Sequence, residues 1–140
     1  PVRILRYQIQ MSLITVDDTN TFSVEESIRD IFMDQTLPDI IICLNELSTT
    51  CVYQAVVDYN CVGEIAILGY YDTDTILKAI ERNVITATIS IDTEQMGAFC
   101  VDALQEYYNY GYTSQYFTAD VTVIDQSNVE EYLGKQEEAE

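Results

Sequence analysis

The sequence contains no histidine and little positive charge: six Lys and Arg stand against 24 Asp and Glu, for a formal net charge of −18. Without an imidazole there is no Ser-His-Asp or Cys-His arrangement and no His-ligated zinc, so most hydrolase mechanisms are excluded. Binding to a polyanion needs a basic surface, which excludes DNA and RNA as partners. An anionic membrane surface would also repel the chain. We therefore expect a protein that is not an enzyme and uses no cofactor or metal.

Long apolar runs, proline and glycine are also scarce. No stretch of 18 apolar residues occurs, so we expect no direct membrane insertion. Apolar residues make up 48% of the sequence, and the chain has 11 Tyr and 4 Phe but only five Gly and two Pro. A disordered acidic tail lacks that hydrophobic content, so we expect a folded acidic chain. Its 140 residues fit one domain or one large piece of a two-lobed protein.

The four cysteines match neither a CxxC redox motif nor a zinc knuckle in their spacing. They are Cys43, Cys51, Cys61 and Cys100. Each lies in an apolar stretch, where cysteine packs as a small hydrophobic side chain. We expect four buried thiols.

Strand-like and helix-like patterns alternate along the chain, which predicts an α/β fold of three α-β-α layers with a mostly parallel, doubly wound sheet. The apolar runs predict strands over residues 9–16, 39–44, 64–69, 84–89 and 116–124. The run 39–44 has the continuous apolar character of a central strand buried on both faces. Residues of capping type predict helices that begin at Ser23, Ser48, Asp72 and Asp92 or Thr93, the last ending at Gly111.

Ligands of open parallel sheets bind beyond the carboxyl ends of the strands. The candidates at these ends are Asp17 and Asp18, Asn45 and Glu46, Tyr70 to Asp72, and Ser90 to Asp92. The acids among them have an alternative role as caps of the helices that follow. An amide such as that of Asn45 suits a hydroxyl-rich ligand as well as a tight turn. Tyr70 and Tyr71 could stack on a sugar ring or lean against the sheet.

Five segments, in order and in register over about residues 10 to 133, resemble type I periplasmic sugar-binding proteins and the effector domains of lactose-repressor-type regulators. The segments are Pro38–Glu46 (PDIIICLNE), Ile65–Tyr70 (IAILGY), Ile80–Ile89 (IERNVITATI), Gln95–Gly97 (QMG) and Val121–Leu133, which contains VTV and NVEEYL. The resemblance implies two doubly wound lobes with a small polar ligand, usually a sugar, in the cleft between them. Residues 1–90 would form the second lobe, 91–124 a hinge crossover helix and strand, and 125–140 an acidic C-terminal segment.

The resemblance also implies a ligand-binding set of Asn45, Glu46, Tyr71, Asp72 and Asp92. Asn45 matches a ligand-contacting amide, and Glu46 stands where the family usually has Asp. The family's Asp after Gly-Tyr falls on Tyr71, with an acid one residue later at Asp72. Its hinge Gln falls on Ile91, beside Asp92. These departures weaken the expectation of an ordinary pentose or hexose and leave two alternatives, a different ligand or none.

By this resemblance the protein would be the solute-binding component of an ABC-type transport or sensing system, outside the cytoplasm. The alternative is the effector-binding domain of a cytoplasmic transcription regulator. In the family, the helix that matches 92–110 packs on the first lobe, so here its apolar stripe is expected to be covered by a second copy, through a homodimer or an exchange of elements.

Two further readings come from acidic residues. Leu13–Asp18 resembles the strand and acidic pair that hold magnesium in signalling receiver domains, and carboxylate oxygens suit that ion. Against this reading, Leu44 and Asn45 stand where a receiver needs its Asp nucleophile. An enzyme with paired carboxylates from Asp18, Glu46 and Asp72 is the remaining alternative.

Overall fold

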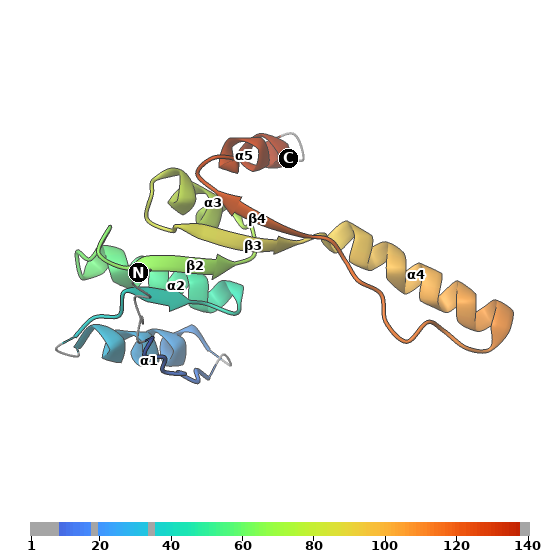
Figure 1. The fold of residues 1–140 in the computed structure, drawn as a ribbon, viewed down its shortest axis with the longest axis horizontal. Helices are drawn as coiled ribbons and strands as arrows, with labels where there is room; N and C mark the ends of the chain where they lie inside the picture. Colours follow the sequence, from blue (N-terminus) through green and yellow to red (C-terminus); the bar gives the residue numbers. More distant parts are fainter. Residues whose placement is uncertain (1–8, 18–19, 34–35, 138–140) are drawn as a thin grey trace, which may run out of the picture.

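The computed structural model describes residues 9–17, 20–33 and 36–137, which form a mixed α/β fold (Figure 1). The elements in chain order are α1 (Thr21–Met33), β1 (Ile40–Ile42), α2 (Glu46–Asp58), β2 (Ala66–Tyr70), α3 (Asp74–Glu81), β3 (Ala87–Ile91), α4 (Thr93–Tyr110), β4 (Val121–Asp125) and α5 (Val129–Glu137). The predicted alternation of strands and helices is confirmed.

The four strands of the described ranges form one sheet in the order β1-β2-β3-β4. The pairs β1–β2 and β2–β3 are parallel, and β3–β4 is antiparallel. The mostly parallel sheet is therefore confirmed, and the carboxyl ends of β1, β2 and β3 share one edge. β4 runs the other way because α4 projects away from that edge and the chain returns to it before β4 begins (Figure 1).

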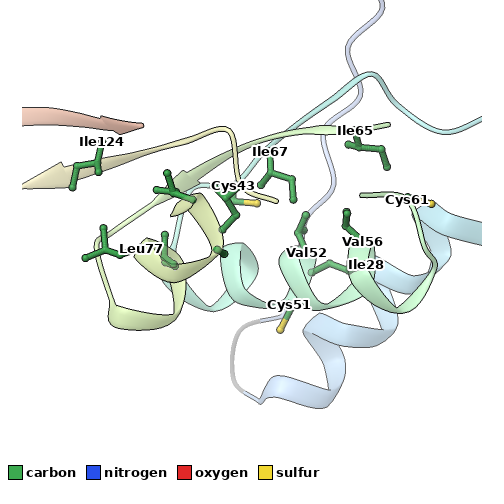
Figure 2. Close-up of a cluster of buried hydrophobic side chains, with 14 of the residues drawn as sticks. Ile28, Cys43, Cys51, Val52, Val56, Cys61, Ile65, Ile67, Leu77 and Ile124 are labelled. Atoms are coloured by element: carbon green, nitrogen blue, oxygen red, sulfur yellow. The ribbon is translucent and has the colours of Figure 1, made fainter. Parts of the chain in front are cut away.

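The core lies on one face of the sheet. Ile67 of β2 and Ile124 of β4 are fully buried there, together with Val24 of α1, Val56 of α2 and Ile76 of α3. Figure 2 shows Val52, Val56 and Ile28 gathered beneath Ile67. On the opposite face, apolar side chains of every strand are exposed: Ile40, Ile42, Leu68, Ile89, Val121 and Val123. The described residues thus form one helical layer over the sheet and leave its other face open.

Two strand predictions are corrected. Residues 9–17 form no regular structure, and Ile9 and Met11 are each 89% exposed. An alternating pattern becomes a strand only beside a partner strand, and no described strand pairs with this segment. Among the described strands, β1 lies at the edge of the sheet rather than at its centre, with Ile40 and Ile42 more than half exposed. An apolar run predicts a strand but does not determine which neighbours flank it.

Three helix starts are also corrected. Asn20 rather than Ser23 lies at the start of α1, since its Oδ1 accepts the Ser23 N–H at 2.9 Å. Asn45 rather than Ser48 caps α2. The N-cap of α3 is Thr73 rather than Asp72, and Thr73 makes no side-chain capping bond. The Asp72 carboxylate accepts a hydrogen bond from Ser90 of β3. In each case the competing polar residue lies within three positions of the predicted one.

The longest helix is the best-predicted element at both ends. Asp92 caps α4 through its Oδ1, which accepts the Gln95 N–H at 2.8 Å, and Gly111 ends it with φ +77°. No residue of α4 is buried. None of the described helices combines the length and apolarity that crossing a membrane requires. The expected acidic segment after β4 contains one further helix, α5, whose Val129 is buried against the core.

The expectation of four buried thiols holds for three of them. Cys43, Cys51 and Cys61 are buried, whereas Cys100 is exposed because it lies on the uncovered helix α4. Burial raises the pKa of the Cys43 thiol to about 11, and the Cys51 thiol beside it adds to that shift. Burial also raises the pKa of Cys51, with the charge of Glu25 acting in the same direction.

Candidate functional site

The five predicted site residues lie at one edge of the sheet. Asn45 and Glu46 follow β1, Tyr71 and Asp72 follow β2, and Asp92 follows β3. These three strands are neighbours and run parallel, so their carboxyl ends lie side by side. The structure therefore places the predicted residues together, whereas the earlier candidate Asp17 lies in the irregular segment 9–17 and Asp18 lies outside the described residues.

Asn45 is held in place by the first turn of α2. Its Oδ1 accepts hydrogen bonds from the Ser48 N–H and the Ser48 Oγ, each at 2.7 Å. The two roles weighed for this side chain are compatible, because the cap uses the amide oxygen while the amide nitrogen remains a donor. Glu46, the first residue of the helix, is exposed beside it, and the helix dipole favours a negative charge there.

Asp72 is held by a hydrogen bond from the neighbouring strand. Its Oδ2 accepts a hydrogen bond from the Ser90 Oγ at 2.7 Å. Ser90 belongs to β3 and is 8% exposed, so this contact joins the ends of two strands from the buried side. A carboxylate that accepts a short hydroxyl bond has a fixed orientation.

Tyr71, between β2 and Asp72, has a left-handed backbone with φ +82°. This region is unusual for a bulky residue and marks local strain. Its N–H donates to the Ile89 carbonyl at 2.8 Å, and its carbonyl accepts from the Thr88 Oγ1 at 2.6 Å. The turn is thus bonded to β3 on both sides of Tyr71. The ring packs partly against the core and lies 6.4 Å from that of Tyr70, centroid to centroid.

The edge is open and acidic. Glu46, Asp72 and Asp92 contribute three carboxylates, and the Asp92 carboxylate also caps α4. No group of three His, Cys, Asp or Glu side chains in the described ranges is arranged to hold a metal ion. Two surface hollows lie elsewhere, one between α1 and α2 and one between α4 and the return to β4. The site residues therefore form a wall rather than a closed pocket.

Sequence reasoning missed the residues that support this wall. Thr49 accepts a hydrogen bond from the Tyr70 N–H at 3.0 Å, and Thr88 donates to Tyr71. Both are buried hydroxyls. The available signal was weak: Thr49 stands between Ser48 and Thr50, and Thr88 between Thr86 and Ser90, so nothing in the sequence singles them out. A buried Thr must find a hydrogen-bond partner, but the sequence does not say which one.

Solved structures with the same fold were found, whereas neither a family model nor a curated protein sequence matches the chain. A structure described as the XylFII-LytSN complex is 24% identical, with a TM-score of 0.66, over 79% of this chain and 38% of that chain. A solute-binding protein of an ABC transporter from Agrobacterium vitis with bound D-fucose is 16% identical, with a TM-score of 0.72, over 82% of this chain and 40% of that one. The Caulobacter myo-inositol binding protein, bound to myo-inositol, is 18% identical, with a TM-score of 0.69, over 82% and 40%.

These similarities concern the fold, because the identities are low. The chain spans about two fifths of the length of the structures it matches. The Agrobacterium vitis and Caulobacter structures are solute-binding proteins of the kind that the five sequence segments resemble. The chain therefore has the α/β fold of part of a periplasmic-binding-protein-like structure.

Proposed function

We propose that this chain is a non-catalytic binding protein that holds a small polar ligand, such as a sugar, at the carboxyl edge of its sheet. The observation that carries the proposal is that Asn45 and Asp72 stand at the ends of adjacent parallel strands, in a fold shared with structures that hold D-fucose and myo-inositol. In a two-lobed protein this edge would be one wall of the cleft, with 1–90 as the second lobe and 91–124 as the hinge crossover. The protein would then act outside the cytoplasm in an ABC-type transport or sensing system.

The side chains at the edge suit a hydroxyl-rich ligand. The carboxylates of Glu46, Asp72 and Asp92 accept hydrogen bonds, and the amide nitrogen of Asn45 donates them. A hydroxyl group does both, so one ring can satisfy donors and acceptors along the wall. Three carboxylates would repel a phosphate or a carboxylate on the ligand. We therefore infer a ligand without negative charge.

Thermal unfolding of the chain with myo-inositol and with D-fucose tests this proposal. A ligand that binds only the folded state raises the melting temperature, so we expect a rise with the neutral compounds and none with glucose 6-phosphate. Asp72→Asn and Asn45→Asp should reduce the rise. Asp58→Asn is the matched control, because Asp58 is exposed and ends α2, at the opposite end of that helix from Asn45. Equal responses of wild type and both site variants would contradict the proposal.

We further propose that a second copy of the chain covers α4. The helix borders an apolar hollow of about 530 Å³, and its lining includes Met96, Phe99, Phe117 and Val121. Leaving large apolar side chains in water costs roughly 1.5 to 3 kcal/mol each, which association would recover. The high negative charge opposes it, so dimerisation should strengthen with salt.

Sedimentation velocity over a concentration series checks the dimer. Leu104→Glu places a charge on an apolar α4 position that is 71% exposed in the single chain, and it should weaken association at least about tenfold. Gln105→Glu adds the same charge at a neighbouring polar position and should have a much smaller effect. A wild-type chain that stays monomeric at high salt and high concentration would refute the proposal.

A further inference from the structure

Three polar side chains are buried among the described residues, and all three bond toward the candidate site. Thr49, Thr88 and Ser90 are 0%, 1% and 8% exposed. Burying a hydroxyl is unfavourable unless it is hydrogen-bonded, so each of them restricts the structure around it to arrangements that supply a partner. Ser90 donates to the Asp72 carboxylate, and the two threonines bond to backbone atoms of Tyr70 and Tyr71, the two residues before Asp72.

Thr49 joins α2 to the end of β2. Its Oγ1 donates to the Asn45 carbonyl at 2.7 Å, one turn earlier in the helix, and accepts the Tyr70 N–H at 3.0 Å. The same oxygen therefore fixes the distance between the residue that caps α2 and the residue that precedes Tyr71. A valine at this position would have the same shape but could make neither bond.

Thr88 joins β3 to the turn itself. Its Oγ1 donates to the Tyr71 carbonyl at 2.6 Å, while the adjacent Ile89 carbonyl accepts the Tyr71 N–H at 2.8 Å. These two bonds orient both peptide groups of Tyr71, and its left-handed backbone is the conformation that satisfies both. The cost of positive φ at a tyrosine is thereby offset by bonds from the neighbouring strand.

Gly69 lets the two threonines approach. It lies opposite Thr88 in the β2–β3 register. A Cβ at this position would lie 2.6 Å from the Thr49 Cγ2 and 3.2 Å from the Thr88 Oγ1. The backbone of β2 is therefore in contact with both side chains, and any larger residue would push at least one hydroxyl away from its partner.

We infer that Thr49 and Thr88, packed against Gly69, are positioning residues that fix the Tyr71–Asp72 turn relative to Asn45 and so set the geometry of the proposed ligand-binding wall. The inference rests on the proposed function for what the turn is used for. The contacts of Thr49 and Thr88 with the turn, which we call the clamp, are a property of the protein without ligand. Neither threonine touches the ligand in this scheme. They act through Tyr70, Tyr71 and Asn45.

NMR of the isotope-labelled chain tests the clamp without any ligand. A residue with positive φ shows a strong intraresidue NOE between its amide and α protons, so Tyr71 can be followed directly. We expect Thr88→Val and Thr88→Ala to weaken this NOE and shift the amide signals of Tyr71 and Asp72, and Thr88→Ser to restore them. Thr49→Val should shift the amide of Tyr70.

Affinity for myo-inositol, measured by titration of the same samples, separates positioning from folding stability. Thr49→Val and Thr88→Val should each weaken binding about tenfold, the loss expected for one buried hydrogen bond or somewhat more. Thr50→Val is the matched control: its Oγ1 also donates one turn back, to the Glu46 carbonyl at 3.1 Å, but it makes no hydrogen bond to any of the described strands. It should leave the affinity within about twofold.

The inference is overturned if the valine variants lower the melting temperature but leave the Tyr71 NOE and the affinity unchanged, or if Thr50→Val acts like Thr49→Val. If wild type binds no myo-inositol while Thr88→Val still releases the Tyr71 conformation, the clamp stands and the choice of ligand is wrong. The two failures are therefore distinguishable.

Discussion

Substituting alanine for Gly69 is a direct test of the close contact beneath the site. Gly69 lies in β2 with ordinary extended geometry, so alanine should gain roughly 0.5 to 1 kcal/mol from its lower entropy loss on folding. Against that gain, the new Cβ would lie 2.6 Å from the Thr49 Cγ2. Overpacking of this kind typically costs about 1 to 3 kcal/mol. We expect Gly69→Ala to lower the free energy of unfolding by about 1 to 2 kcal/mol.

A second substitution identifies the atom responsible. Thr49→Ser removes Cγ2 but keeps the hydroxyl, at a cost of about 1 kcal/mol for one buried methyl group. In that background the nearest remaining atom to the new Cβ is the Thr88 Oγ1 at 3.2 Å, so Gly69→Ala should become nearly neutral. Urea unfolding followed by circular dichroism gives all four stabilities, and we expect an interaction free energy of about 1 to 2 kcal/mol. Equal costs of Gly69→Ala in both backgrounds would refute the reasoning.

Three other predictions follow from the cysteines and the cap of α2. A thiol-specific reagent should label Cys100 alone in the native protein and the three buried thiols only in urea; mass spectrometry decides, and native labelling of a second cysteine would contradict the burial. Because burial raises the folded-state pKa of Cys43 from 9.0 to about 11, the unfolded state loses its proton first as pH rises. The free energy of unfolding should therefore fall between pH 9 and 11, by about 2 to 3 kcal/mol from this thiol, and urea titrations should find a smaller fall in Cys43→Ala. Asn45→Ala should cost about 1 kcal/mol by removing the cap, whereas Asn45→Asp should cost little in the same assay, because a carboxylate oxygen can still accept the Ser48 N–H.

The fold could be predicted where a local signal is sufficient. Both ends of α4 could be predicted, because the cap at Asp92 and the left-handed Gly111 each act within one turn of the helix. The position of β1 could not be predicted in this way, since the run Ile40–Ile42 reads the same at the centre or the edge of a sheet. The segment 9–16 has a strand pattern but no partner strand among the described residues, and it forms no strand. Both outcomes depend on which strands lie beside the segment, and a short window of sequence does not contain that information.

The site divides in the same manner. Asn45 and Asp72 could be found because they directly follow apolar strands, and parallel strands bring such positions together. Thr49 and Thr88 could not be found, because their importance depends on the pairing of Gly69 with Thr88 and on how closely α2 packs over β2. Register and packing distance follow from the whole sheet, so the supporting hydroxyls become visible only in the folded structure.

Three consecutive residues between β2 and α3, namely Tyr71, Asp72 and Thr73, depart from the arrangements that usually stabilise a turn and a helix start. Tyr71 has positive φ, whereas the other non-glycine residues with positive φ among those described, Asn60 and Asn83, are of the type that tolerates it. Asp72, the residue predicted to cap α3, bonds to Ser90, and the N-cap Thr73 makes no side-chain capping bond. The Thr73 Oγ1 is buried and has no hydrogen-bond partner in the described structure. Each departure costs stability. A glycine at position 71 and a capping aspartate at position 73 would remove all three, so we expect another use for the turn. Their concentration beside Asn45 is what we expect of a surface shaped for a ligand rather than for its own folding.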